Sequence, residues 1–303
     1  MRESGVSFKR ILVPLDGSEL AERALVPAQA LAEAMTAKLF FIRVAIPLSL
    51  NLDPKLYQRN IAMKQNEATR YLKSVQSGFS SSSVDIKTQV LVGRAAKSIL
   101  KCVQEKEIDL IVMSSHGRSG MNRWIYGSVA DKVLHNAPCA KVIIHPQVII
   151  KPFEPFSIKR ILVPLDGSSL AEQALEPALA LAEAVSAKLI LHQATTAPLI
   201  QPLPDWPGPY VVLDAAEQEA ISYWQGVHSA MGDSPVSITS RIATGPAAES
   251  IIDIADNQKV DLIVMCSHGC SGIERWVFGS VAEKVLRGAN CITLVIWNQE
   301  VLK

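Results

Sequence analysis

The stretch KRILVPLDGS at residues 9–18 recurs without a change at residues 159–168. Farther along the chain, LAEAMTAKL at residues 31–39 is matched by LAEAVSAKL at residues 181–189, again with a separation of 150 residues. Matching segments at a fixed separation indicate an internal repeat of the architecture. The sequence therefore predicts two related units in tandem.

A longer block extends the repeat toward the end of each unit. IDLIVMSSHGRSGMNRWIYGSVADKVL at residues 108–134 and VDLIVMCSHGCSGIERWVFGSVAEKVL at residues 260–286 are identical at 19 of 27 positions. Here the separation is 152 residues, so the middle of each unit differs in length while both ends are preserved. This is the pattern expected of a surface loop that varies on a fixed scaffold.

The boundary between the units is predicted near residue 150. Pro146, Pro152 and Pro155 lie between the two repeats and interrupt helices and inner strands. A chain of 303 residues is also about twice the usual domain size of roughly 100–200 residues. We therefore predict one domain over residues 1–150 and a second over residues 151–303.

The apolar pattern within one unit alternates between strand and helix. RILVPL at residues 10–15 is a short, nearly continuous apolar run, typical of a strand buried on both faces of a parallel sheet. Helical spacing follows from the N-cap Ser18 to Met35, with a bend expected at Pro27. The same reasoning predicts strands at residues 38–46, 84–92, 109–114 and 140–145 and helices at residues 55–77, 95–106 and 128–136.

This βαβαβαβαβ order predicts the α/β class of fold. Strands that alternate with helices of this length form a parallel sheet with right-handed crossovers. Each unit is therefore expected to be a doubly wound, Rossmann-like domain with a five-stranded parallel sheet.

Composition excludes several classes of protein. With 49% hydrophobic and 19% charged residues the chain can build packed cores, so it is not a disordered polymer. A net charge of +1 provides no strong positive field for sequence-independent binding to nucleic acid. The sequence contains neither a signal-peptide core nor an apolar stretch long enough to span a bilayer, so we expect a cytoplasmic protein with no membrane partner.

The cysteines indicate reduced thiols. The chain has five of them, an odd number without a CxxC pair. Cys266 and Cys270 are separated by three residues, and no further ligands lie nearby at zinc spacing, so no metal site is predicted.

Polar motifs follow the predicted strands where a ligand crevice is expected. In an open parallel sheet the crevice lies beyond the carboxyl ends of the strands, where the strand order reverses. Asp16 follows the first strand, Ser114 and Gly117 follow the fourth, and Gly127 and Ser128 open the next helix. Glycines that admit a ligand close to the backbone and a helix N-terminus with unpaired N–H groups favour a phosphate.

Asp16 and its counterpart Asp166 would repel a phosphate. We therefore expect these carboxylates on the sugar or base side of a nucleotide. The pattern has an alternative interpretation, because Ser128 with Asp131, like Ser280 with Glu283, fits a helix capping box whose hydroxyl satisfies only its own helix. The glycines could likewise serve only to form turns.

Other motifs offer little chemistry. Neither GxxxxGK[ST] nor GxGxxG occurs, which disfavours a P-loop NTPase and a dinucleotide-binding site. His116 and His268 have no serine and acid partners at a recognisable spacing, so we interpret them as loop-shaping residues and predict no catalytic residue. Trp124 and Trp276 occupy equivalent positions and are interpreted as packing anchors, with ligand stacking or an interface as the alternatives.

On these motifs the chain resembles the universal stress protein family over nearly its whole length. The resemblance rests on ILVPLDGS, on Gly93 and Gly245 after the third strands, and on the SHG…GSVA blocks. Nucleotide-binding members of that family carry G-x2-G-x9-G-[ST] after the fourth strand. Here the pattern reads Ser114-x2-Gly117-x9-Gly127-Ser128, and in unit two Cys266-x2-Gly269-x9-Gly279-Ser280.

The first glycine of the pattern is thus replaced in both units. Ser114 and Cys266 are small, so a backbone donor could still reach a phosphate, but with less room. Unit one also has Arg118 where unit two has Cys270, so unit one is expected to bind an anion better.

The resemblance implies the adenine nucleotide alpha hydrolase-like fold and a site for ATP or AMP, with Mg²⁺ carried in by the nucleotide. In unit one the implied site residues are Pro14, Asp16, Val44, Met113, Ser114, Gly117, Arg118, Gly127, Ser128 and Val129. In unit two they are Pro164, Asp166, Ala194, Met265, Cys266, Gly269, Cys270, Gly279, Ser280 and Val281.

Family members commonly pair through their last strands. The resemblance therefore implies that AKVIIH at residues 140–145 pairs with CITLVIW at residues 291–297 within the chain, as a pseudo-dimer able to form a homodimer. The function it implies is a regulatory protein of the stress response that binds an adenine nucleotide and acts on an unknown protein partner. The alternatives are a dimeric scaffold that binds no nucleotide and a slow ATPase in which Asp16 helps to hold Mg²⁺.

Overall fold

The computed structural model describes most of both units. The described residues are 8–47, 53–79, 83–116, 126–150, 156–195, 222–229, 231–232, 234–267 and 278–297.

Unit one alternates strands and helices in the predicted order. Its elements are β1 (Arg10–Leu15), α1 (Glu19–Glu22), α2 (Leu25–Met35), β2 (Lys38–Ala45), α3 (Pro54–Ser77), β3 (Ile86–Val92), α4 (Ala95–Glu105), β4 (Leu110–Ser114), α5 (Ser128–Asn136) and β5 (Ala140–Ile144).

Unit two repeats this order. Its elements are β6 (Arg160–Leu165), α6 (Ser169–Glu172), α7 (Leu175–Val185), β7 (Lys188–Thr195), β8 (Ile238–Thr244), α9 (Ala247–Asn257), β9 (Leu262–Cys266), α10 (Ser280–Gly288) and β10 (Ile292–Ile296). Residues 222–229 are also helical and precede β8.

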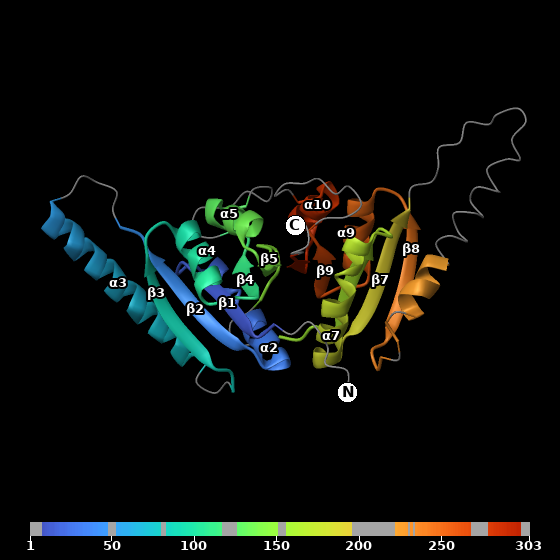
Figure 1. Cartoon of the computed structure of the whole chain (residues 1–303), viewed down its shortest axis with the longest axis horizontal. Helices are drawn as coiled ribbons and strands as arrows, with labels where there is room; N and C mark the ends of the chain where they lie inside the picture. Colours follow the sequence, from blue (N-terminus) through green and yellow to red (C-terminus); the bar gives the residue numbers. More distant parts are fainter. Residues whose placement is uncertain are drawn as a thin grey trace, which may run out of the picture.

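The strands of both units form one sheet of ten strands, in the order β3-β2-β1-β4-β5-β10-β9-β6-β7-β8 (Figure 1). Pairing is parallel within each unit, which confirms the predicted α/β fold. β5 and β10 pair antiparallel, with Leu294 opposite Val142, so the last strands do join the two units within the chain. We call this β5–β10 pairing the seam.

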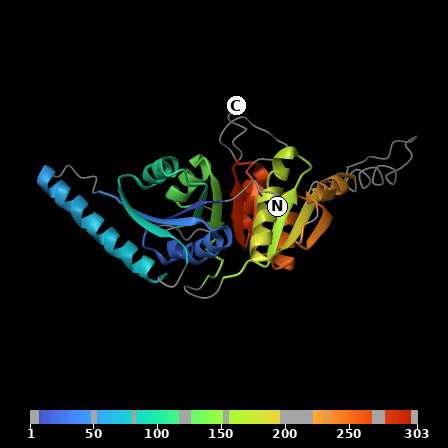
Figure 2. The ribbon, with the colours of Figure 1, turned by 60° about the horizontal axis from the view of Figure 1, so that its bottom comes forward.

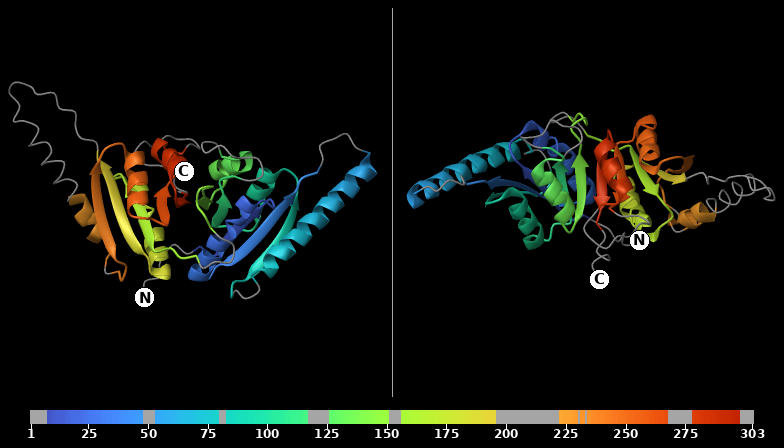
Figure 3. Two further views of the ribbon diagram at one scale, coloured as in Figure 1. Left: turned by 180° about the vertical axis from the view of Figure 1, so that it is seen from behind. Right: turned by 90° about the horizontal axis from the view of Figure 1, so that it is seen from above.

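Helices cover both faces of the sheet, and each face is shared by the two units. α2, α3 and α7 pack on one face and contribute to one buried cluster, whereas α4, α5, α9 and α10 pack on the other (Figures 1 and 3). α3 runs along the outer side of unit one, beside β2 and β3 (Figure 2). Both hydrophobic cores therefore continue across the seam.

The four strands around the seam are buried at every position, namely β4, β5, β9 and β10. This explains why they occur in the sequence as mostly apolar runs, interrupted only by Ser114 in β4, Lys141 in β5 and Thr293 in β10, since side chains on both faces of such a strand meet helices. None of the helices among the described residues is long and apolar enough to cross a bilayer.

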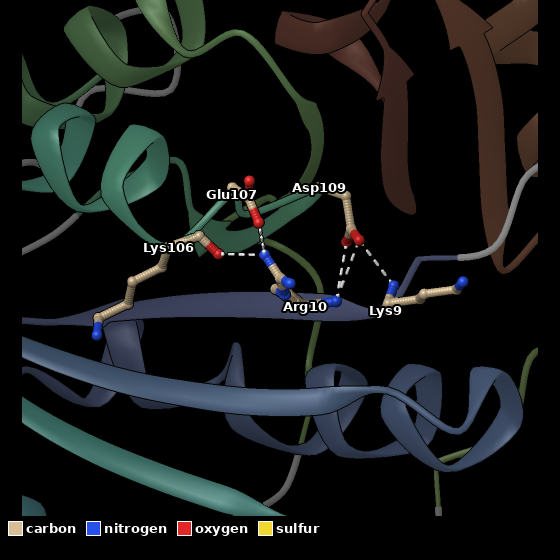
Figure 4. A network of polar contacts seen from close by, with 5 residues as sticks. All are labelled: Lys9, Arg10, Lys106, Glu107 and Asp109. Atoms are coloured by element: carbon tan, nitrogen blue, oxygen red, sulfur yellow. Dashed lines mark hydrogen bonds and ion pairs between the residues drawn. The ribbon is translucent and has the colours of Figure 1, made fainter.

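An aspartate at the start of β4 fixes the beginning of β1. Asp109 accepts hydrogen bonds from the backbone N–H of Lys9 at 2.8 Å and of Arg10 at 3.1 Å (Figure 4). The guanidinium of Arg10 pairs with Glu107 and donates to the carbonyl of Lys106 at 3.0 Å. These contacts hold the central strands in register, which places their carboxyl ends side by side.

The helix after β1 differs from the prediction of one bent helix. It is divided into α1, which ends at Glu22, and α2, which begins at Leu25, and the same division separates α6 from α7. Pro27 lies in the first turn of α2, where a helix does not need the missing N–H, so a new helix starts before the proline instead of bending around it.

Candidate functional site

A cavity of about 380 Å³ lies at the carboxyl ends of β1, β2 and β4 in unit one. β1 and β4 are neighbours, and the strand order reverses there, as the crevice prediction requires. The cavity brings together eight of the ten residues expected in unit one: Pro14, Asp16, Val44, Met113, Ser114, Gly127, Ser128 and Val129. Gly117 and Arg118 lie outside the described residues.

The Asp16 carboxylate orders the turn that follows β1. Its Oδ1 atom accepts hydrogen bonds from the backbone N–H of Ser18 at 2.9 Å and from the Ser18 hydroxyl at 2.6 Å. The Ser18 oxygen in turn accepts from the N–H of Ala21 at 3.2 Å and so caps α1. This arrangement holds the carboxylate at the edge of the cavity.

The start of α5 is not a capping box. The N-cap residue is Gly127, which has no side chain, and Ser128 is the first residue of the helix. The N–H of Asp131 bonds to the carbonyl of Gly127 at 2.9 Å, as in an ordinary first turn. α10 begins in the same way at Gly279. The capping interpretation of Ser128 and Ser280 is therefore wrong, because each serine lies one position too far into its helix.

One wall of the cavity is apolar. Ile42, Val44, Ala95, Ile99 and Met113 line it, from β2, α4 and β4. Ala95 and Ile99 belong to a helix that sequence reasoning did not assign to the site. Their helical spacing was visible in the sequence, but which face of α4 meets the carboxyl edge depends on tertiary packing.

A charged group also lines the cavity. Arg43 of β2 pairs with Glu67 of α3 at 3.2 Å, and Lys64 pairs with the same carboxylate at 3.1 Å. The Arg43 guanidinium also lies over the ring of Tyr71, 4.5 Å from its centre. Sequence reasoning missed these residues, although a cation inside the apolar run KLFFIRVAI was a signal that β2 meets something polar.

The Tyr71 hydroxyl completes this cluster by donating to Glu22 at 2.8 Å. Burial, followed by the hydrogen bond to the Glu22 carboxylate, raises the pKa of Tyr71 above its ordinary value. The phenol therefore stays protonated at neutral pH and serves as a donor.

His116 also lines the cavity, and its contacts fit a role in shaping the loop. Its Nδ1 atom lies 3.0 Å from the Ser115 hydroxyl, and its backbone N–H donates to the Ser114 hydroxyl at 3.4 Å. The Ser114 side chain that replaces the motif glycine is thus turned toward the loop backbone. His268 and the tryptophans Trp124 and Trp276 lie outside the described residues.

Gly17 permits the approach of Arg43, which leads to a testable difference between the units. Gly17 and its counterpart Gly167 have φ values of +84° and +83°, so alanine is strained at either position, by roughly 1–2 kcal/mol. A Cβ on Gly17 would also lie 3.2–3.3 Å from the Arg43 guanidinium, whereas the nearest atom to a Cβ on Gly167 is Gln193 Nε2 at 4.0 Å.

We therefore expect Gly17→Ala to lower the urea midpoint more than the matched variant Gly167→Ala. Equal losses would show that Arg43 can move aside without cost.

Unit two places its expected residues at equivalent positions but with different neighbours. Pro164, Asp166, Ala194, Met265, Cys266, Gly279, Ser280 and Val281 lie at the carboxyl ends of β6, β7 and β9 and at the start of α10. The cavity of unit one contains none of them, and Gly269 and Cys270 lie outside the described residues. Asp166 repeats the turn of unit one, with Ser168 donating to it at 3.0 Å and 2.5 Å.

Toward the carboxyl end of β7, unit two has a polar residue where unit one has an apolar one. His192 stands at the position of Ile42, fully buried, with Nε2 2.9 Å from the Ser250 hydroxyl and Nδ1 3.2 Å from the carbonyl of Arg241. Burial lowers the pKa of His192, so the ring is neutral; Nδ1 then donates to the carbonyl and Nε2 accepts from Ser250. Gln193 stands at the position of Arg43.

The described thiols are buried and unpaired. Cys102, Cys139, Cys266 and Cys291 form no disulfide, and burial raises the pKa of Cys266 to about 12. Such a thiol stays protonated and unreactive at neutral pH. Among the described residues, no cluster of three or more His, Cys, Asp or Glu side chains could hold a metal ion.

Comparisons with known proteins agree with this architecture. The model of the universal stress protein family matches the chain twice, over residues 7–145 and 157–296. A universal stress protein of Methanocaldococcus jannaschii is 30% identical over 142 residues, which cover 45% of this chain and 82% of that protein. One of Methanothermobacter thermautotrophicus is 30% identical over 139 residues, covering 44% of this chain and 92% of the relative.

Solved structures match nearly the whole chain. A universal stress protein from Archaeoglobus fulgidus superposes with a TM-score of 0.67 at 20% identity, covering 96% of this chain and 97% of that one. A functionally unknown protein from Pseudomonas aeruginosa gives a TM-score of 0.67 at 18% identity, covering 97% and 94% of the two chains. At these identities the likeness shows the fold. The chain belongs to the universal stress protein family, as a member with two tandem units.

Proposed function

We propose that unit one binds an adenine nucleotide, ATP or AMP, in the cavity at its carboxyl edge. The observation that carries this proposal is the pairing of an apolar wall with the start of α5, where Gly127 leaves the first helical turn without a side-chain cap. The base packs against Ile42, Ile99 and Met113, and the phosphates meet the backbone N–H groups of α5. Helix N-termini attract phosphate through these groups and through the helix dipole.

The size and charge of the cavity support this orientation. Its volume of about 380 Å³ lies within the range of roughly 300–1,000 Å³ of small-molecule sites. The Asp16 carboxylate would repel a phosphate, so it belongs on the ribose side, where it can also contact Mg²⁺ carried by the nucleotide. Gly117 and Arg118 complete the proposed phosphate end, and Arg118 supplies its positive charge.

Unit two is proposed to bind the same ligand more weakly. Its site comprises the ten residues equivalent to those of unit one, including Gly269 and Cys270. The His192 and Ser250 pair replaces an apolar contact, and Cys266 fills space that a glycine would leave.

We further propose that the nucleotide acts as a signal and is not turned over. A bound ligand shifts the populations of two states by its difference in affinity between them, which suffices for regulation. The protein is proposed to act in the cytoplasm, alone or as a homodimer, on a protein partner. Phosphate release that is abolished by Asp16→Ala, with binding retained, would instead identify a slow ATPase.

Calorimetric titration with ATP and AMP tests the site. Gly127 lines the cavity, and its φ of −58° is accessible to valine, so we expect the added side chain to take up space in the site while the fold persists. We expect Gly127→Val to weaken binding at least tenfold and the matched variant Gly279→Val to leave the stronger site unchanged. Absence of heat with both nucleotides at millimolar concentration would favour the scaffold that binds no nucleotide.

A further inference from the structure

A second cavity, of about 790 Å³, lies where the two units meet. We call it the seam groove. Unit one contributes Cys139 and Ala140 at the start of β5, and unit two contributes Gln173, Glu176, Pro177 and Trp297 from α6, α7 and the end of β10. It is separate from the cavity proposed for the nucleotide, because the two share no lining residue.

The seam has approximate twofold symmetry. Val142 and Leu294 are equivalent positions of the repeat, and they lie opposite one another where β5 and β10 pair. A twofold axis at this point exchanges the units, so each surface beside the seam occurs twice. The seam groove therefore has a symmetry-related counterpart on the other side of the seam. Each residue of the groove has its repeat equivalent there, for example Arg23 in place of Gln173 and His145 in place of Trp297.

The linker after β5 occupies that counterpart. Arg23 donates from Nη1 to the carbonyl of Pro146 at 2.6 Å and to that of Val148 at 3.3 Å. Gln147 donates from Nε2 to the carbonyl of Ala289 in unit two, at 2.6 Å. Ile150 is buried in the core, with 9% of its surface exposed, whereas its neighbour Ile149 is 83% exposed. The linker thus closes one side of the seam with a defined set of contacts.

The sequence contains a second copy of this linker. Residues 298–303, NQEVLK, follow Trp297 as residues 146–151, PQVIIK, follow His145. They lie outside the described residues. Gln299 corresponds to Gln147, Val301 to Ile149 and Leu302 to Ile150. Trp297 itself lines the seam groove, so the chain leaves β10 at the wall of the groove.

We propose that residues 298–303 dock in the seam groove and close the second side of the seam. By the symmetry of the repeat, Leu302 takes the buried place of Ile150, and the Gln299 amide donates to the carbonyl of Ala137, which is equivalent to Ala289. Gln173 replaces Arg23, and its side-chain amide can donate to the carbonyl groups of residues 298 and 300.

The docked segment would join α6 to unit one. α6 begins immediately after the turn of Asp166, so the segment also braces the carboxyl edge of unit two. The charge of the groove suits Lys303, because its described lining contains Glu107, Asp109, Glu172 and Glu176 and no lysine or arginine.

Leu302→Asp in the full-length chain tests the proposal, with Val301→Asp as the matched control. A buried aspartate in the groove should lower the melting temperature by several degrees and raise amide hydrogen exchange of residues 169–177 at least tenfold. Val301→Asp should change neither, since its counterpart Ile149 is exposed. Ile150→Asp and Ile149→Asp, in the linker that the structure describes, serve as a calibration. They show how far an aspartate lowers the melting temperature at a buried position and at an exposed one.

Identical behaviour of Leu302→Asp and Val301→Asp would overturn the proposal. It would also be overturned if Val6→Asp, in residues 1–7, gave the faster exchange instead, because that result would identify a different occupant. An exchange rate that increased on dilution of the unaltered protein would likewise overturn it and point to a second copy of the chain in the groove.

Discussion

Replacing Lys141 with methionine should stabilise the protein. Lys141 lies in β5 with none of its surface exposed, and its Nζ atom has no hydrogen-bond partner among the described residues. It lies 4.0 Å from the centre of the Trp297 ring across the seam. Burial lowers the pKa of Lys141 to about 8, because a charged amine loses its hydration there, and the nearby Cys139 thiol opposes this to a smaller extent.

The expected gain follows from this pKa. A fall from the ordinary value of about 10.4 to about 8 corresponds to roughly 3 kcal/mol of penalty on the charged form. Methionine removes the penalty but also the cation–π contact, worth about 0.5–2 kcal/mol. We therefore expect a net gain of about 1–2.5 kcal/mol at pH 7, measured by urea unfolding.

The pH dependence separates this cause from better packing. Between about pH 8 and pH 10.4 the unfolded chain keeps the Lys141 proton while the folded protein releases it, so the unfolded state binds more protons there. The free energy of unfolding of the unaltered protein should therefore rise with pH across this window relative to that of Lys141→Met. Below pH 8 the difference between the two proteins should be constant. The exposed control Lys132→Met should show no such difference. A pH-independent gain would mean that the buried amine is not the cause.

The repeat made most of the fold predictable. β4, β5, β9 and β10 are buried on both faces, so their sequences are mostly apolar runs that alternate with helical patterns. The DGS turns directly follow the first strand of each unit, and the GS motifs open the helix after the fourth strand, which is why Asp16, Ser114, Gly127 and Ser128 could be placed at one edge from the sequence alone.

Contacts between distant segments were not predictable. Arg43 was visible as a cation in an apolar strand, but its partners Glu67 and Tyr71 lie on α3, and the packing of that helix depends on the whole sheet. The seam itself follows from the family resemblance, yet its two sides differ in chemistry. His145 Nε2 lies 3.3 Å from the Thr293 hydroxyl on one side, whereas Lys141 meets Trp297 on the other.

Ser128→Glu should weaken nucleotide binding about a hundredfold while leaving the fold as stable or slightly more so. Ser128 is exposed at the first position of α5 and lines the cavity. A carboxylate in a first helical turn interacts favourably with the helix dipole, by about 0.3–1 kcal/mol. The same charge occupies the place proposed for the phosphates, so repulsion and loss of the binding position act together. A hundredfold loss corresponds to about 2.7 kcal/mol.

Ser128→Glu is expected to raise stability and to lower nucleotide affinity, and this difference in sign distinguishes a binding role for the start of α5 from a purely structural one. If the start of α5 served only the fold, a charge that suits the dipole would raise the melting temperature and leave calorimetric titration with ATP unaltered. If it binds phosphate, stability and affinity change in opposite directions in one variant. Ser280→Glu at the equivalent exposed position of α10 is the matched control, since it adds the same charge to unit two. If both variants lost affinity equally, the two units would contribute equally to binding, which would contradict the assignment of the stronger site to unit one.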